Sequence, residues 1–101
     1  MTKPENEEHL VLTLFITGAS ANSVRAVNNI RTICNTHIPD SYTLEIVDVY
    51  LRPELAQVEQ IIALPTLIRR SPAPERRFVG DLSDTKKVLA GLGIETRDND
   101  Y

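Results

Sequence analysis

An apolar stretch that is hydrophobic on both of its faces, residues 10–16, most constrains the fold of this chain. Such a run is typical of a central β-strand that is covered on both sides. A helix then begins at Ser20 or Asn22, which are both good N-cap residues. Its apolar face, read at helical spacing, consists of Val24, Val27, Ile30, Ile33 and Cys34. A second strand follows at 43–50, so the first half predicts a right-handed parallel β-α-β unit.

The second half contains shorter elements separated by turn residues. Pro53 suits the first position of a helix. The expected apolar face of that helix consists of Leu55, Val58, Ile61 and Ile62. An antiparallel hairpin is expected to join 66–70 to 76–80, and a last helix is capped by Asp81 or Ser83. The predicted class is therefore α/β, with the thioredoxin-like order β-α-β-α-β-β-α.

Ser20 and Ser23 stand at the start of the first helix, where a thioredoxin carries its two cysteines. The segment 64–67, which contains Pro65 and Thr66, resembles the proline-threonine loop that such folds place opposite that helix start. A hydroxyl has no accessible thiolate state, so the pair cannot exchange disulfides. The sequence predicts a scaffold reused for binding. The alternative is an enzyme of glutathione-transferase type that uses Ser20, which needs a nearby base or oxyanion donors.

The single cysteine, Cys34, excludes an internal disulfide and a cysteine-rich metal site. It falls on the apolar helix face, so we expect a buried structural thiol. His9 and His37 are expected to be solvated, and no metal or other cofactor is predicted. No apolar run approaches the roughly 20 residues that span a bilayer. The start of the chain shows no leader pattern, so we expect a cytoplasmic protein without membrane contact.

The net charge of −3 is unevenly distributed along the chain. A polar N-terminal tail, residues 1–9, and an acidic C-terminal tail, residues 95–101, each carry −2. The single thioredoxin-like domain expected at 10–94 is therefore slightly basic. The chain is long enough for one small domain with a modest core.

Four arginines crowd together in that domain, opposed nearby only by Glu75: Arg69, Arg70, Arg76 and Arg77. Such clusters occur in nucleic-acid-binding proteins. No aromatic platform or recognition-helix pattern accompanies this one, so we expect an acidic protein surface as the partner and no nucleic acid. Helical periodicity exposes Arg25 as well. Asp48 lies in mid-strand between two valines and is expected to be a hydrogen-bonded structural or interface group.

Five residues of the second half weaken its local preference for one fold, namely Pro65, Pro72, Pro74, Gly91 and Gly93. X-Pro bonds isomerise with little energetic bias, and the glycines weaken the end of the last helix. Two packings of similar free energy are therefore expected. Alanine at both glycines is expected to favour the last helix by up to about 2 kcal/mol, less where the φ of the glycine is positive.

Five short motifs occur in order and without gaps over residues 10–93. They read Asn-Ser-Val-Arg-Ala at 22–26, Val-Asp-Val at 47–49, Leu-Pro-Thr-Leu at 64–67, Arg-Arg at 76–77 and Gly-Asp-Leu-Ser-Asp at 80–84. Together they strongly resemble the KaiB family, the small component of the bacterial Kai clock system.

The resemblance implies a protein without enzymatic activity that binds KaiC, a hexameric RecA-like ATPase. KaiB proteins are metamorphic: a resting β-α-β-β-α-α-β fold assembles as a homotetramer, and a rare monomeric thioredoxin-like form binds KaiC. The family link extends to a sensor histidine kinase that competes for the same KaiC surface. A resting homotetramer or dimer is expected, with Arg25, Arg69 and Arg77 in its subunit contacts.

Three positions depart from the cyanobacterial pattern. Glu45 and Gln60 stand where lysines are usual, and Ala21 replaces a proline. A change from lysine to glutamate at a charged interface turns attraction into repulsion. These differences favour a paralogue or a simpler KaiB–KaiC system, such as an hourglass-like timer or a stress-response regulator, over a self-sustained oscillator.

Overall fold

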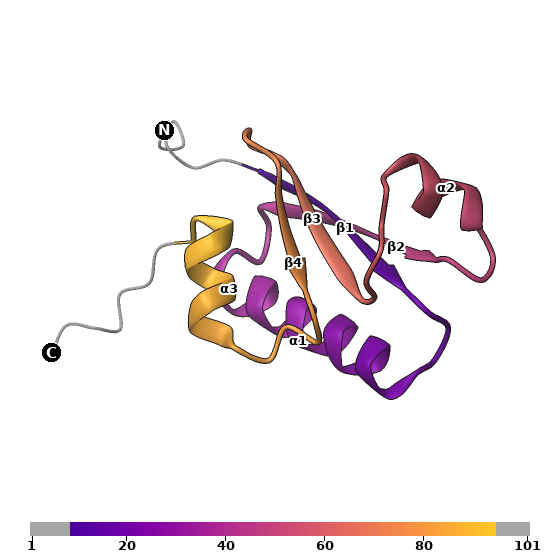
Figure 1. Cartoon of the computed structure of the whole chain (residues 1–101). Helices are drawn as coiled ribbons and strands as arrows, with labels where there is room; N and C mark the ends of the chain where they lie inside the picture. The colour runs from indigo at the N-terminus through magenta and orange to yellow at the C-terminus, as the bar shows by residue number, and fades with distance from the viewer. Residues whose placement is uncertain (1–8, 95–101) are drawn as a thin grey trace, which may run out of the picture.

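The computed structural model describes residues 9–94 and has the element order β-α-β-α-β-β-α (Figure 1). The elements are β1 (Leu10–Ile16), α1 (Ala21–His37), β2 (Tyr42–Asp48), α2 (Pro53–Val58), β3 (Thr66–Ser71), β4 (Arg76–Val79) and α3 (Thr85–Leu92). The predicted thioredoxin-like order is confirmed. The second arrangement, β-α-β-β-α-α-β, stays a prediction. The calls on the tails fall largely on residues 1–8 and 95–101, which lie outside the described residues.

The four strands form one sheet in the order β2-β1-β3-β4. β1 pairs in parallel with β2 and antiparallel with β3, and β4 pairs antiparallel with β3. β1 is therefore a central strand, as its two apolar faces predict. The two edges of the sheet are β2 and β4.

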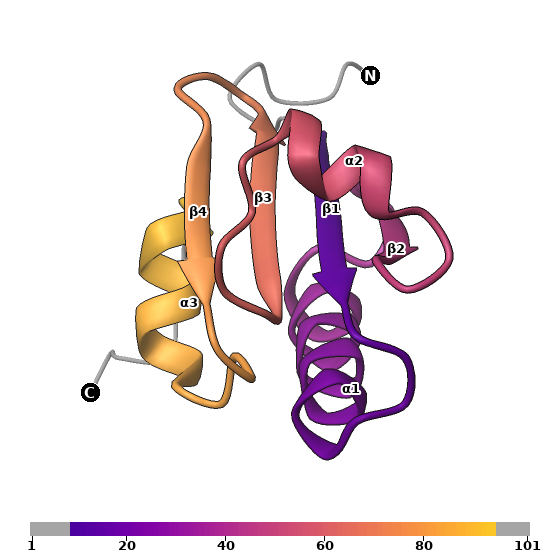
Figure 2. The same cartoon turned by 45° about the vertical axis from the view of Figure 1, so that its right-hand side comes forward.

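The helices cover the two faces of this sheet unequally (Figure 2). On one face, which we call the α1–α3 face, the two longer helices bury the larger core around Leu12, Leu14 and Leu67. On the other, the α2 face, a smaller cluster consists of Phe15, Val47 and Ile68, with α2 and its flanking loops packed against it. The short α2 leaves much of this second face uncovered.

The buried face of α1 differs from the predicted one at its first turn. Val24 is 46% exposed, whereas Ser23 and Ala26 are fully buried. The buried row runs through Ser23, Ala26, Ile30 and Ile33 at spacings of three and four residues. Val24 lies about 100° around the helix from Ser23 and so points off this row.

Two details of the second half also differ from expectation. α2 ends at Val58, and Gln60 adopts a positive φ of 58°, so the expected apolar face is broken. As a result, Val58 and Ile62 are exposed and only Leu55 and Ile61 reach the core.

The N-cap of α3 is Asp84, rather than Asp81 or Ser83 as expected. Its carboxylate accepts the backbone N–H of Lys87 at 3.2 Å. The helix therefore begins later than the sequence pattern indicates. Across residues 9–94, no helix is long and apolar enough to cross a membrane. The same part of the chain has no cluster of three or more potential metal-ligating side chains.

Candidate protein-interaction surface

Three hydroxyl groups meet at the start of α1, where a thioredoxin carries its cysteines. Ser20 is the N-cap, and its oxygen accepts the backbone N–H of Ser23 at 3.3 Å. The Ser20 hydroxyl donates to Ser23 Oγ at 2.9 Å, and the N–H of Thr17 donates to the same oxygen at 3.0 Å. These hydrogen bonds satisfy the two serine hydroxyls and the free backbone N–H of Ser23 at the helix start. The arrangement confirms the predicted capping role of Ser20.

Asp48 joins two loops at the same end of the sheet. Its Oδ1 accepts the backbone N–H groups of Gly18 at 3.1 Å and Tyr50 at 2.9 Å. Gly18 has a φ of 54°, a left-handed conformation that glycine adopts without strain. Thr66 pairs with the end of β1, so the Pro65 loop lies near this end, as predicted. Asp48 is thus a hydrogen-bonded structural group, and its role in partner binding stays a prediction.

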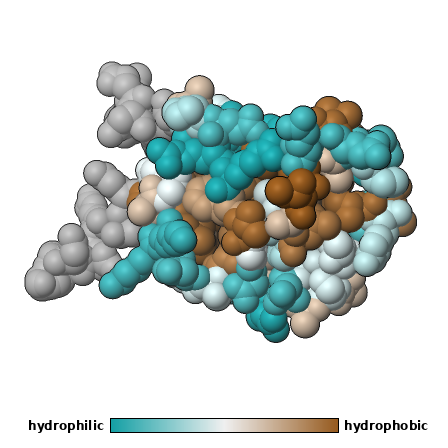
Figure 3. All heavy atoms as spheres, in the orientation of Figure 1, coloured by the Kyte–Doolittle hydropathy of each residue, from teal (hydrophilic) through white to brown (hydrophobic). Residues whose placement is uncertain are grey.

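The α2 face carries the most exposed large apolar side chains of the described chain. Ile62 is 96% exposed and Leu51 is 79% exposed. Their exposed neighbours in sequence or on the same face are Tyr50, Val58 and Val79. Figure 3 shows hydrophobic residues in a band that crosses this view of the molecule and reaches the α2 end. Scattered single apolar residues are ordinary, but a gathering of them indicates an interaction site.

An ion-pair network lies on the same face and joins the hairpin β3–β4 to the end of α2. Arg70 and Arg77 contact Glu59 at 3.1 and 3.4 Å. The same two arginines contact Glu75 at 3.9 and 3.6 Å. Two arginines and two glutamates thus neutralise one another. The expectation of a cluster opposed only by Glu75 is wrong, because the fold brings Glu59, at the end of α2, to Arg70 and Arg77.

The position of Arg69 also differs from the prediction, which placed this residue in the basic cluster. It points to the α1–α3 face and is only 7% exposed. Its guanidinium donates to the carbonyl oxygens of Leu92 at 3.2 Å and Pro74 at 2.7 Å. Arg69 therefore ties the end of α3 to the hairpin turn. Its role in the subunit contacts of the resting form stays a prediction.

Arg25 is exposed, as predicted, and reaches across to the loop before α3. Its Nε lies 3.2 Å from Asp81 Oδ2, and it also donates to Asn22. Asp81 accepts the N–H of Ser83 at 3.1 Å. Hydrogen bonds from Ser83, and then the charge of Arg25, lower the pKa of the Asp81 carboxyl below its ordinary value. Asn29 adds a bond to the Asp81 carbonyl, so α1 is fastened to this loop.

The surroundings of Gly91 and the backbone conformation of Gly93, the two glycines proposed for fold switching, change the effect expected of an alanine substitution at each. A Cβ on Gly91 would overlap the Phe78 ring, at 2.7 Å from Cζ. Gly93 is the C-cap of α3 with a left-handed φ of 79°, which an alanine adopts at a cost. The expected gain from alanine at both positions is therefore wrong for this fold. The peptide bonds before Pro65, Pro72 and Pro74 are cis, and the switching role of these prolines stays a prediction.

Glu45 lies on the α2 face, next to Thr13 in the register of the sheet. Arg76 lies on the opposite face, beside Arg69. Their binding roles stay predictions.

Sequence reasoning missed the partnership of Glu59 with the arginines and the exposed pair Tyr50 and Leu51. The signal for that pair was available, since two large apolar residues stand in a loop directly before a helix start.

A KaiB-domain family model matches residues 13–94 of this chain. Over 85 residues, the chain is 47% identical to the circadian clock protein KaiB3 of Synechocystis sp., covering 84% of this chain and 83% of that protein. Over 93 residues, it is 41% identical to the circadian clock oscillator protein KaiB of Synechococcus elongatus, with coverage of 89% and 91%.

Solved structures with a similar fold come from two groups. The N-terminal domain of Synechococcus elongatus SasA matches with a TM-score of 0.69 at 18% identity, covering 100% of this chain and 97% of that one. A thioredoxin from Fasciola hepatica matches with a TM-score of 0.69 at 22% identity, with coverage of 90% and 86%. These likenesses show a thioredoxin-like fold. The sequence relatives are circadian clock proteins, which supports a regulatory role in a circadian clock. By the family match and these identities, the chain belongs to the KaiB family.

Proposed function

We propose that this chain is a regulator without chemistry of its own that binds a KaiC-type hexameric ATPase and modulates its phosphorylation and ATPase cycle. The observation that carries this proposal is the KaiB-domain match over residues 13–94. The hydroxyl cluster supports the absence of catalytic activity. The Ser20 hydroxyl donates a hydrogen bond to Ser23 within a helix cap. A thioredoxin-like scaffold with hydroxyls in place of thiols retains a shape for binding and lacks a redox group.

The α2 face is the binding surface in this proposal. Its exposed apolar residues Leu51 and Ile62 occur on the same side of the sheet as a neutralised ion-pair network, and interfaces combine such apolar anchors with polar groups. Burying one large aliphatic side chain contributes about 1.5–3 kcal/mol. Glu45 lies on this face, so we expect a basic group opposite it on the partner. Such a partner differs from one that recognises lysine at this position.

The arrangement described for residues 10–94, which we take as one domain, is the binding form in this proposal. A second packing of the same residues, β-α-β-β-α-α-β, serves as the resting homotetramer or dimer. The system is a timer or stress-response regulator of the cytoplasm, and a sensor histidine kinase competes for the same ATPase. Glu45 and Gln60, in place of lysines, support this reading over a self-sustained oscillator.

Calorimetric titration of this chain into a KaiC-type ATPase from the same genome tests the proposal. We expect saturable binding by the unaltered chain. Ile62→Glu places a charge in the apolar patch and should weaken binding at least about tenfold, which corresponds to about 1.4 kcal/mol. Val24→Glu, at an exposed valine of α1, is the matched control and should leave binding within about twofold. No binding by the unaltered chain would overturn the proposal, and equal loss in both variants would overturn the assignment to the α2 face.

The glutathione-transferase alternative makes a different prediction. It requires that glutathione binds near Ser20 and that conjugation to an electrophilic substrate depends on the Ser20 hydroxyl. We expect no heat of glutathione binding and no conjugation. Conjugation that Ser20→Ala abolishes would support the alternative and contradict the proposed function.

A further inference from the structure

A groove of about 700 Å³ lies between β4 and α3, on the side of the sheet away from α2. Arg76 and Phe78 line it from the strand, and Lys87 and Ala90 line it from the helix. β4 is an edge strand, so its outer backbone groups pair with no strand among the described residues. An open edge beside a groove is the geometry with which proteins accept an added peptide strand.

The charge of this groove is positive. Glu75 also lines it, but its carboxylate is engaged with Arg70 and Arg77. Within residues 9–94, neither Arg76 nor Lys87 has an ion-pair partner. Two cations thus face a strand edge and an aromatic side chain. Acidic residues on a bound strand would supply the missing negative charge.

A buried arginine of β3, Arg69, which pairs with the groove-lining Arg76, points to the same ligand. Arg69 stands directly across the strands from Arg76, and like charges in that position destabilise a sheet. Arg69 is more than nine-tenths buried, and its Nε has no hydrogen-bond partner among the described residues. Its other nitrogens bond only to backbone carbonyls. A carboxylate arriving beside Arg76 would offset both uncompensated guanidinium charges.

We propose that this groove binds an extended acidic peptide segment of a partner protein. The segment adds to β4 as a further strand through backbone hydrogen bonds. Its carboxylates pair with Arg76 and Lys87, and its apolar atoms cover Phe78. This site lies mainly on the other side of the sheet from the α2 face and meets it at Glu75 and Arg77.

Titration of the isotope-labelled chain with hexaglutamate, followed by NMR, tests the site, with hexaglutamine as the uncharged control. We expect saturable shifts of the amides of Arg76–Val79 and of residues 87–91 with hexaglutamate only. The double variant Arg76→Gln with Lys87→Gln should weaken binding at least about tenfold. Arg31→Gln with Lys86→Gln removes equal charge from exposed positions outside the groove and should change the affinity by less than about twofold. Both variants replace exposed side chains, so both should fold.

Four results with the full chain and its variants would overturn the proposal. They are the absence of saturable shifts up to millimolar peptide, equal shifts with hexaglutamine, equal loss in the control variant, and shifts confined to the α2 face. The chain truncated after Ile94 provides a further check on the occupant. A marked gain in hexaglutamate affinity on truncation would assign the groove to the acidic residues 95–101 of this same chain rather than to a partner. Unchanged affinity supports a partner segment.

Discussion

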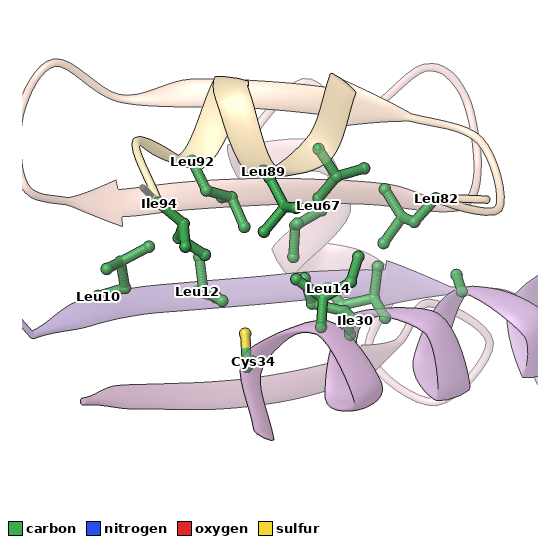
Figure 4. Packing of buried hydrophobic residues seen from close by; sticks show 13 residues of the cluster. Leu10, Leu12, Leu14, Ile30, Cys34, Leu67, Leu82, Leu89, Leu92 and Ile94 are labelled. Carbon is green, nitrogen blue, oxygen red and sulfur yellow. The ribbon is translucent and has the colours of Figure 1, made fainter. Parts of the chain in front are cut away.

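Cys34 lies on α1 against the sheet, with its sulfur directed toward the leucines of β1 (Figure 4). It is fully buried, as its place on the apolar helix face predicts. Burial raises the pKa of the thiol to about 11, because a thiolate would have to form away from water. The thiol is therefore a packing group of the core. The hydroxyls of Ser20 and Ser23, at the thioredoxin cysteine positions, likewise serve the structure.

The reactivity of Cys34 tests this account at the residue scale. Below its pKa the thiolate fraction falls about tenfold per pKa unit, and the thiolate is the form that alkylates. With a pKa of about 11 instead of the ordinary 9.0, alkylation by iodoacetamide at pH 8 should be about 100-fold slower than in the unfolded chain. Mass spectrometry of timed samples, with and without denaturant, measures both rates. Equal rates would show that the thiol is accessible and that α1 does not pack as described.

Asp81 gives a prediction on pH. Its folded pKa is lowered by the hydrogen bonds from Ser83 and by Arg25, so ionised Asp81 stabilises the fold. This contribution is fully present above the ordinary pKa of an aspartate and is lost as the pH falls through the lowered folded value. The difference in unfolding free energy between the unaltered chain and Asp81→Asn should therefore be largest near neutral pH and shrink in acid. Urea unfolding at pH 7, 5 and 3 measures it, and a difference that grows toward pH 3 would contradict the assignment.

At the scale of elements, α3 is fitted to the hairpin by its two glycines. Gly91 leaves room for the Phe78 ring, and Gly93 ends the helix with a left-handed residue. Arg69 then bonds to the carbonyl of Leu92 from β3. The glycines thus suit this arrangement of α3, whereas their low helix propensity alone predicts that they weaken it.

Alanine substitutions separate these effects. Gly91→Ala should raise the free energy of unfolding by less than the roughly 1 kcal/mol expected from helix propensity, because the Phe78 ring must move. In a Phe78→Ala background the same change should recover the full gain, so the double-mutant cycle should show coupling. Gly93→Ala should destabilise the fold by about 1 kcal/mol, because its φ is positive. Denaturant unfolding measures all of these, and additive effects at Gly91 and Phe78 would contradict the packing.

The element order and most helix starts could be predicted from the sequence, because caps, prolines and apolar spacing are local signals. The end of α2 could not, because apolar residues at helical spacing continue through Ile62 beyond the last helical turn. The burial of Arg69 and the pairing of Glu59 with Arg70 were also out of reach. Both depend on how helices pack against the hairpin, since Glu59 caps the end of α2 and Arg69 bonds to the end of α3. Local sequence patterns do not encode such tertiary contacts.

At the scale of the whole molecule, the second half of the chain extends the sheet from β1, on the side of β1 opposite β2. β3 joins β1 in antiparallel register, with Leu14 opposite Leu67, and both side chains are fully buried. The two proposed interaction surfaces lie mainly on opposite sides of this sheet and meet at Glu75 and Arg77. The α2 face carries the apolar patch, and the β4–α3 groove carries the uncompensated positive charge. Both surfaces are built from the second half, so a different packing of that half would remove them together.

Methyl NMR of this chain bound to a KaiC-type ATPase tests the central claim most directly. With methyl-labelled leucines and an unlabelled ATPase, the bound chain should show a nuclear Overhauser contact between Leu14 and Leu67. That contact reports the antiparallel pairing of β1 with β3. The account predicts a stable complex in which this contact is strong. The absence of a complex, or a complex in which Leu14 and Leu67 are not in contact, would contradict it.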